Sequence, residues 1–447
     1  MDRATARSVI VVDLGFGDAG KGIVTDALVR RLGARAVVRF NGGAQAGHNV
    51  VLPDGRHHTF AQLGSGSFVD GVRTFLSRHV VVHPTALRFE ADHLASVGVP
   101  NALERVTISG EARVVTPFHQ AACRVREIAR GDARHGSCGV GIGETMRDGL
   151  EFPEDVVRMS HLSDPRTLRR LLVRAQERLF EAVRTIVDLA PDERALFVDP
   201  SVVDAWIASL PALDVVDEDE WARRLAAERT VVFEGAQGVL LDEWRGFHPY
   251  TTWSTCTFDN ALELATGEIT RLGVLRTYAT RHGPGPFPTE RTLSQPEPHN
   301  AHGPWQGGFR QGHLDLALLR YAIDACRGVD ALAVTHLDAL ERLPEWHICT
   351  AHVPVSEDAH LFDPRGTPRL GRFTDLDHQS ALTRALERVT PRIERPFAHA
   401  TPARVVSFLE RALGAPVMLG SAGPTHRDVR SFQRTVTTSP TLSVPCP

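Results

Sequence analysis

Lysine is almost missing from this sequence. Of the 50 lysines and arginines in the chain, only Lys21 is a lysine. A lysine that persists against such a bias favours a role that arginine cannot fill, because its ammonium is a compact point charge and not a planar fork. Chance is the alternative, and the position of Lys21 inside a glycine-rich segment speaks against it.

Several other features are absent, and each absence argues against a class of protein. No apolar run reaches about 18 residues, the length that a membrane-spanning helix needs. The formal net charge of -4 gives no basic excess for binding nucleic acid or a membrane surface. None of the six cysteines forms a C-x-x-C pair, and no charged-then-apolar signal segment precedes the first predicted strand. We therefore expect a cytoplasmic protein with free thiols and small-molecule partners, with no nucleic acid and no membrane.

Short buried strands alternate with helical segments. Residues 8–14 form a continuous Val- and Ile-rich run that is typical of a buried strand, and a helical pattern follows at 23–32. Further strands are predicted at 36–40, 230–233 and 331–334. This order predicts an α/β fold with a large, mostly parallel central sheet and helices on both faces. Ligands bind at the carboxyl ends of strands in such sheets, so the turns after these strands should form the site.

No repeat or linker divides the chain. Residues 1–447 are therefore predicted to form one catalytic domain, with helical insertions at about 84–220 and a C-terminal subdomain at about 341–447. Residues 165–189 follow the helical period. Residues 282–312 are rich in Gly and Pro without periodicity, which predicts a long functional loop.

The segment Gly15–Gly22 reads G-F-G-D-A-G-K-G and fits a phosphate-binding loop, in which glycines let backbone N–H groups turn toward phosphate oxygens. The residues predicted to bind the nucleotide phosphates are Gly17, Gly20, Lys21 and Gly22. Gly22 stands where such loops usually carry the hydroxyl that binds Mg²⁺, so another oxygen must bind the metal. Asp18 is the nearest candidate, with a turn-forming role as its alternative.

A second glycine-rich segment, Asn41–His48, follows the second predicted strand and reads N-G-G-A-Q-A-G-H. Its glycines suit a close approach of the backbone to a ligand. A histidine such as His48 is more often structural when it stands alone, so its role depends on the rest of the pattern.

Together these motifs resemble the adenylosuccinate synthetase family over most of the chain. The matching pieces keep the family's order and approximate spacing. They are G-F-G-D-A-G-K-G at 15–22, V-V-R-F-N-G-G-A-Q-A-G-H at 37–48, F-E-G-A-Q-G-V-L-L-D at 233–242, P-Y-T-T-W-S-T at 249–255, T-R-H-G-P-G-P-F-P-T-E at 280–290, T-H-L-D-A-L at 335–340 and S-A-G-P at 421–424. The resemblance implies a GTP- and Mg²⁺-dependent reaction in which the 6-oxygen of IMP is phosphorylated and the amino group of aspartate then displaces phosphate. It also implies a homodimer.

The resemblance assigns roles to several residues. Asp18 would be the general base and a Mg²⁺ ligand, His48 would stabilise charge on the 6-oxygen, and the Gly47 carbonyl would also bind Mg²⁺. Asp338 lies in the turn that reads guanine in the family, where a carboxylate accepts two hydrogen bonds from the base; an exposed aspartate after a strand is the alternative. The remaining implied contacts with GTP are His336, Ser421 and Gly423.

The substrate half departs from the family pattern. The family's arginine-rich run, which binds the aspartate carboxylates, reads Q-G-G-F-R-Q-G-H-L-D at 306–315 and keeps only Arg310. The loss of bidentate guanidinium groups should weaken the binding of a dicarboxylate. Cys138, His282 and Gln45 replace a threonine, a valine and an asparagine of the family. The substrate contacts implied are Gln45, Cys138, Gln237, Thr252, His282 and Arg310.

The sequence therefore predicts a divergent paralogue. It would be a GTP- and Mg²⁺-dependent carbon–nitrogen ligase that acts on an IMP-like purine nucleotide and uses aspartate or a different amine. One alternative is a kinase- or GTPase-type paralogue acting on another oxo-heterocycle in a specialised nucleoside or secondary-metabolite pathway. Another is a non-catalytic nucleotide-binding protein.

Overall fold

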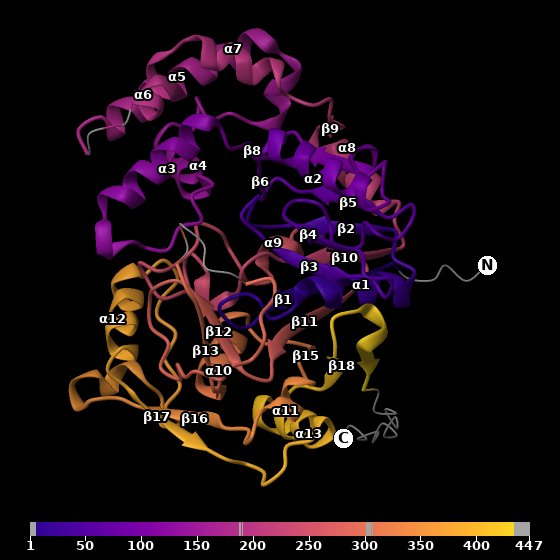
Figure 1. The fold of residues 1–447 in the computed structure, drawn as a ribbon, viewed down its shortest axis with the longest axis vertical. Helices are drawn as coiled ribbons and strands as arrows, with labels where there is room; N and C mark the ends of the chain where they lie inside the picture. The colour runs from indigo at the N-terminus through magenta and orange to yellow at the C-terminus, as the bar shows by residue number, and fades with distance from the viewer. Residues whose placement is uncertain (1–5, 187–188, 190, 301–304, 306, 433–447) are drawn as a thin grey trace, which may run out of the picture.

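The computed structural model describes residues 6–186, 189, 191–300, 305 and 307–432, and these build a central sheet of 10 strands (Figure 1). Neighbouring strands are parallel, except for the antiparallel pair at one edge. From that edge to the other, the strands are β19 (Val429–Ser431), β18 (Val417–Ser421), β15 (Ala331–Thr335), β11 (Glu268–Arg276), β1 (Arg7–Asp13), β10 (Thr230–Glu234), β2 (Ala36–Arg39), β5 (Arg73–Leu76), β7 (Val106–Ser109) and β9 (Val215–Val216).

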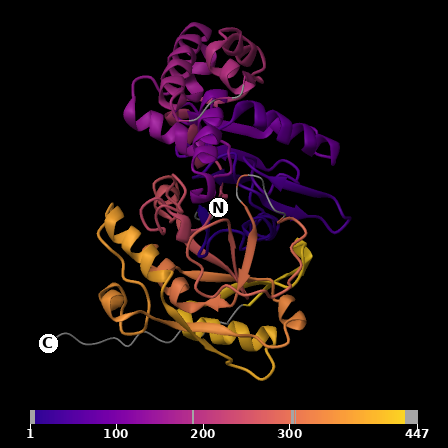
Figure 2. The same cartoon turned by 60° about the vertical axis from the view of Figure 1, so that its left-hand side comes forward.

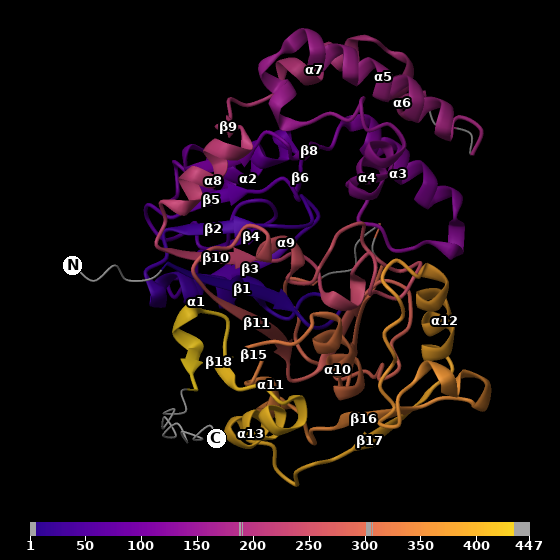
Figure 3. The same cartoon turned by 180° about the vertical axis from the view of Figure 1, so that it is seen from behind.

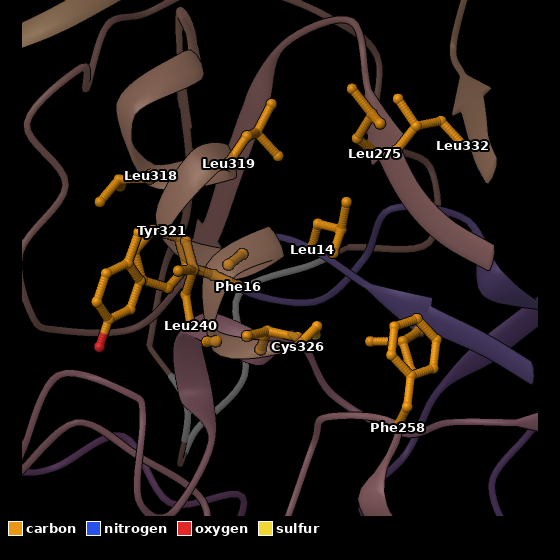
Figure 4. Packing of buried hydrophobic residues seen from close by; sticks show 14 of the residues in the cluster. Leu14, Phe16, Leu240, Phe258, Leu275, Leu318, Leu319, Tyr321, Cys326 and Leu332 are labelled. Atoms are coloured by element: carbon orange, nitrogen blue, oxygen red, sulfur yellow. The ribbon is translucent and has the colours of Figure 1, made fainter. Parts of the chain in front are cut away.

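The central position of β1 follows from its continuous apolar run, because both of its faces are covered. Val9 and Val11 pack with helix α1 (Lys21–Leu32) on one face. The alternate residues and Leu14 lie in the large cluster on the other face, where Leu14 shares the buried space with Leu275 (Figure 4).

The other helices extend the molecule on both sides of the sheet. They are α2 (Pro84–Ser96), α3 (Pro117–Ala129), α4 (Ile142–Glu151), α5 (Pro165–Val183), α6 (Pro191–Val198), α7 (Ser201–Ala208), α8 (Glu218–Ala226), α9 (Asp259–Leu262), α10 (Leu316–Ala325), α11 (Ala339–Arg342), α12 (Leu376–Leu386) and α13 (Pro402–Leu413). Helices α3 to α7 form a lobe at one end of the molecule, whereas α13 lies toward the opposite end (Figures 2 and 3).

Short strands outside the central sheet shape the loops around its carboxyl edge. The pairs are β3 (His48–Val51) with β4 (His57–Phe60), β6 (Val81–Val82) with β8 (Arg113–Val114), and β12 (Ala279–His282) with β13 (Phe309–Gly312). A further three-stranded sheet has the order β14 (Leu314–Asp315), β16 (Ile348–Val353) and β17 (Thr390–Glu394).

The predicted α/β architecture is confirmed. The strands expected at 8–14, 36–40, 230–233 and 331–334 are β1, β2, β10 and β15, all in the central sheet. The helix expected at 165–189 is α5, which ends at Val183, and residues 187–188 lie outside the described residues.

Two predicted segments differ from the structure. The segment 84–220 is not only helical, because β7 and β9 extend the central sheet. The segment 282–312 is not entirely irregular, because β13 pairs with β12 as an antiparallel ribbon, with Phe309 opposite His282. The Gly- and Pro-rich composition of this segment did not predict the ribbon, because β13 depends on its pairing with β12 and not on a strand pattern of its own. Residues 301–304 and 306 lie outside the described residues.

Candidate active site

A cleft of about 530 Å³ opens beside the carboxyl ends of β1, β10 and β15. Most of the residues predicted for the site line this cleft, although they come from loops far apart in the sequence. They are Gly17, Asp18, Gly20, Lys21, Gly22, Gln45, Gly47, His48, Gln237, His282, His336, Asp338, Ser421 and Gly423. This is the edge at which open α/β sheets bind ligands.

The glycine-rich loop joins β1 to the N-terminus of α1. Its backbone is left-handed at Gly17 (φ 92°), Asp18 (φ 60°) and Gly20 (φ 91°), and α1 begins at Lys21. Left-handed residues before a helix N-terminus make backbone N–H groups converge, and the helix dipole adds positive potential. The loop therefore has the geometry of an anion site. A non-glycine residue is uncommon in this region, and aspartate is one of the few that adopt it readily.

Asp13 organises this loop, and sequence reasoning missed it. One carboxylate oxygen accepts the Gly15 N–H at 2.8 Å, and the other accepts the Ala19 N–H at 2.8 Å and the Lys21 ammonium at 3.0 Å. The Lys21 ammonium also donates to the backbone oxygen of Gln237 at 2.6 Å. The available signal was a carboxylate that ends a buried strand immediately before the glycines.

Close packing explains the glycine that follows Lys21. A Cβ atom at Gly22 would lie 2.7 Å from the backbone oxygen of Asn49 and 3.2 Å from the backbone carbon of His48. The first turn of α1 thus leaves no room for a serine or threonine hydroxyl. Asp18, whose side chain is 26% exposed, is the carboxylate of this loop that reaches the cleft.

His48 is held by a buried carboxylate. Its Nδ1 lies 2.7 Å from Oε1 of Glu234. The Glu234 carboxylate also accepts hydrogen bonds from Ser65, from the hydroxyl at Oε1 and from the backbone N–H at Oε2. Burial opposes the charge on Glu234, but the neighbouring His48, Arg39 and Ser65 hold the pKa of this carboxyl below its usual value. The ionised carboxylate only accepts, so Nδ1 carries a proton and Nε2 is the nitrogen left for a ligand.

The pKa of His48 is lowered, because burial outweighs the opposing effect of Glu234. The imidazole is therefore neutral at neutral pH. An oxyanion that binds at Nε2 would raise this pKa and favour the protonated, donating ring.

A chain of contacts links the base candidate to a more distant segment. The Asp18 carboxylate lies 3.4 Å from Nε2 of His282. The backbone oxygen of Asp18 accepts a hydrogen bond from Arg276 at 2.5 Å. The buried Arg276 guanidinium also bonds to Glu297 and, at 2.9 Å, to the hydroxyl of Tyr278. Sequence reasoning did not single out Arg276 or Glu297, because nothing local joins positions 18, 276 and 297.

The predicted base-reading turns lie together. The Leu337 N–H donates to the backbone oxygen of Ser421 at 2.9 Å, which joins the turn after β15 to the turn after β18. One carboxylate oxygen of Asp338 accepts a hydrogen bond from Arg342 at 2.9 Å. Burial, reinforced by nearby arginines, lowers the pKa of His336 far below its usual value, so this ring is neutral beside the cleft.

Two glutamines bring unpaired polar groups to the cleft. Within the described part of the chain, the buried Gln45 amide has no partner for either its nitrogen or its oxygen, and Gln237 Oε1 has none. Buried polar groups are ordinarily hydrogen-bonded, so these groups suit the polar edge of a ligand.

Three predicted substrate residues lie outside this cleft. Cys138 is in the loop before α4, where burial raises its thiol pKa to about 11. The Thr252 N–H donates to the Leu241 oxygen at 2.8 Å. The Arg310 guanidinium donates to Glu290 and to the Gly285 oxygen, each at 2.8 Å. Their substrate roles stay predictions.

The helices of the described chain include none with the length and apolar character needed to cross a membrane.

Comparison with known sequences extends over nearly the whole chain. The sequence model of the family described as adenylosuccinate synthetase matches residues 10–430. The adenylosuccinate synthetase of Pseudomonas fluorescens is 32% identical over 94% of this chain and 97% of its own. That of Syntrophobacter fumaroxidans is 31% identical over 93% of this chain and 97% of its own.

Solved structures share the fold. Fully ligated adenylosuccinate synthetase from Plasmodium falciparum superimposes with a TM-score of 0.76 at 21% identity, covering 95% of this chain and 99% of the other. The succinoaminodeoxyadenylate synthetase of cyanophage S-2L, bound to dGMP and to dATP as an energy donor, gives 0.59 at 17% identity, with 96% of each chain covered.

Proposed function

The chain belongs to the adenylosuccinate synthetase family of carbon–nitrogen ligases, and from this premise we propose that it is a GTP- and Mg²⁺-dependent ligase. It phosphorylates the 6-oxygen of an IMP-like purine nucleotide and lets an amine displace the phosphate. The observation that carries this proposal is one cleft that contains the phosphate loop, Asp18, the oriented His48 and the turn of Asp338.

Asp18 is the base of the first step. A ring oxygen is a poor leaving group, and its phosphorylation makes it a good one. The Asp18 carboxylate takes the proton from the neighbouring ring nitrogen, which makes the 6-oxygen nucleophilic toward the γ-phosphate. Once the His48 imidazole is protonated, its Nε2 donates a hydrogen bond to the charged 6-oxygen, while Glu234 keeps the imidazole oriented.

The phosphate loop positions the nucleotide. The N-terminus of α1 and the Lys21 ammonium supply positive potential to the phosphates of GTP. Asp338 accepts hydrogen bonds from guanine, which adenine does not offer in the same pattern. His336, Ser421 and Gly423 complete the wall around the base.

The oxygen donors of the cleft fit Mg²⁺. The Asp18 carboxylate and the Gly47 carbonyl both line the cleft, and hard oxygen ligands are those that Mg²⁺ prefers. The packing at Gly22 removes the alternative hydroxyl ligand. When bound, Mg²⁺ neutralises charge that develops on the transferred phosphoryl group.

The first experiment supplies the protein with IMP, GTP, Mg²⁺ and aspartate, and follows GDP release together with a succino-purine product. Asp18→Asn should lower GDP release by at least ~10²-fold, since it removes the general base. Turnover that is unchanged in this variant would contradict the assignment of the base.

A phosphorylating enzyme that stops after the first step is the second candidate. It is favoured by the engagement of Arg310 with Glu290, which leaves that guanidinium bonded within the protein. A phosphorylated heterocycle that accumulates in the presence of amines would support this candidate. A product with a new carbon–nitrogen bond would rule it out.

The homodimer and the cytoplasmic location belong to the same proposal, as do small-molecule partners without nucleic acid or membrane. Light scattering of the purified chain tests the dimer directly. A monomeric mass with full activity would remove it.

A further inference from the structure

Two rings pack together near Asp18: the His282 ring lines the cleft, and the Phe309 ring contacts it. The β12–β13 ribbon places Phe309 opposite His282, and their rings meet edge to face with centroids 4.7 Å apart. The His282 imidazole in turn lies 3.4 Å from the Asp18 carboxylate. The Arg276 guanidinium lies 5.9 Å from the centroid of the Phe309 ring. Phe309 therefore packs against His282 and Arg276, two residues that line the cleft, and is not itself part of the lining.

Arg310 points to the other face of the ribbon, because successive side chains of a strand alternate. Its guanidinium bonds to Glu290 and to the Gly285 oxygen, and it lies 5.4 Å from the Phe287 ring. These contacts satisfy the guanidinium away from the cleft, whose lining does not include Arg310.

Arg281, the residue paired with Arg310 across the ribbon, is also occupied. Its guanidinium donates to the backbone oxygens of Pro284 and Pro286 at 3.0 and 2.8 Å, and it lies 4.2 Å from the Phe16 ring. It is buried and serves the packing of this loop.

The lysine and arginines that line the cleft in the described structure are each paired with a carboxylate. Lys21 pairs with Asp13 at 3.0 Å, Arg342 pairs with Asp338 at 2.9 Å, and Arg276 pairs with Glu297. A nucleoside triphosphate and a nucleotide acceptor already bring several negative charges to this cleft. A donor with carboxylates would add more without a free guanidinium or ammonium to receive them, and like charges in close contact strongly oppose binding.

We propose, on the basis of the ligase function above, that the amine donor of this enzyme carries no carboxylate group. The lone pair of the amine nitrogen forms the bond to C6. The bond between C6 and oxygen breaks, its electrons stay on the departing phosphate, and that phosphate takes the proton lost by the amine. A donor whose body is uncharged requires no counter-charge in this cleft.

The test uses the full chain with IMP, GTP, Mg²⁺ and three donors that share a two-carbon amine core: ethylamine, alanine and aspartate. Each donor adds one carboxylate to the previous one. We expect kcat/KM, calculated for the neutral amine, to fall by roughly 10-fold with each carboxylate. Aspartate used as well as ethylamine, or better, would overturn the proposal.

A hydroxylamine arm separates this inference from the proposed ligase function. Hydroxylamine is a small, reactive nucleophile that makes few demands on a donor pocket. GDP release and an N-hydroxy purine with hydroxylamine, together with preferred use of aspartate, would overturn only the donor class. The absence of any purine product with every nucleophile, over a panel of 6-oxopurine nucleotides, would overturn both.

Variants of Phe309 test the direction of the side chain. Phe309→Arg places a guanidinium next to His282 and Arg276, which line the cleft, and the ratio of kcat/KM for aspartate to that for ethylamine should rise about 10-fold or more. The matched control, Phe309→Leu, removes the ring without adding charge and should leave this ratio unchanged. An unchanged ratio in a folded Phe309→Arg protein contradicts the argument, and the wild-type donor series decides the matter if that variant fails to fold.

Discussion

Replacing Lys21 by methionine removes the only ammonium side chain of the protein while keeping an unbranched chain of similar length. The Lys21–Asp13 pair is buried, with side chains 3% and 0% exposed, and is separated by 3.0 Å. Removal of one partner of a buried ion pair leaves an uncompensated charge and costs about 3–5 kcal/mol. We therefore expect Lys21→Met to lower the free energy of unfolding by about that amount and to abolish GTP turnover.

Urea unfolding followed by tryptophan fluorescence, for which the chain has six tryptophans, measures the first effect. The double variant Asp13→Asn with Lys21→Met removes both charges, and it should recover about 1–2 kcal/mol relative to the single variant, because the stranded carboxylate is gone. Turnover should not recover. Lys21→Arg keeps the charge but forces a larger planar group into the same space, at a cost of about 1–3 kcal/mol. A Lys21→Met protein as stable as the wild type would refute the reasoning.

Three further predictions concern the same cleft. Gly22→Ala should destabilise the protein by about 1–3 kcal/mol although alanine favours helices, because the new Cβ would lie 2.7 Å from the Asn49 oxygen; an unchanged thermal midpoint would contradict this. Asp338→Asn should reduce the preference for GTP over ATP by about 10–100-fold and favour xanthosine triphosphate, in competition assays; unchanged discrimination would mean that another group reads the base. Burial lowers the pKa of His336, so the unfolded chain binds a proton at this residue at a higher pH than the folded chain does. The free energy of unfolding should therefore fall as pH drops below 6.5, by up to about 1.4 kcal/mol per pH unit. His336→Asn, in which asparagine tolerates the φ of 56°, should flatten this pH dependence, and the same slope in variant and wild type would exclude His336 as its cause.

Local pattern was enough for four strands of the central sheet, β1, β2, β10 and β15. Strand β1 is a continuous apolar run that ends at a glycine-rich turn, and its neighbour β10 carries the same signal. Its other neighbour, β11, mixes polar residues into its first half and was not predicted. An apolar run of this kind is buried wherever it pairs with other strands, so its own sequence is enough to predict a buried strand. The β12–β13 ribbon lacks that signal, because His282 and Phe309 pack against each other, while Arg281 and Arg310 bond to Glu290 and to backbone oxygens of the adjoining loop.

The same distinction separates the predicted from the missed site residues. Gly20 and Lys21 belong to one contiguous motif, and the roles predicted for them follow from its spacing. Glu234 acts through His48 at a separation of 186 residues, and Arg276 acts through the backbone of Asp18 at a separation of 258. Such contacts are set by the order of the strands in the sheet, which a single sequence does not reveal.

The structure links two features that the sequence presents separately, the scarcity of lysine and the glycine after Lys21. The Lys21 ammonium is enclosed between Asp13 and the Gln237 oxygen, so one carboxylate of this region is already committed to holding the loop. Gly22 is pressed against the strand that begins at His48, so the loop cannot carry a metal-binding hydroxyl there. Asp18 is thus left as the acidic group of this loop that reaches the cleft, with its backbone fixed by Arg276. In the proposed function, phosphate binding and proton removal consequently depend on one short loop, and a change that loosens it should impair both steps together.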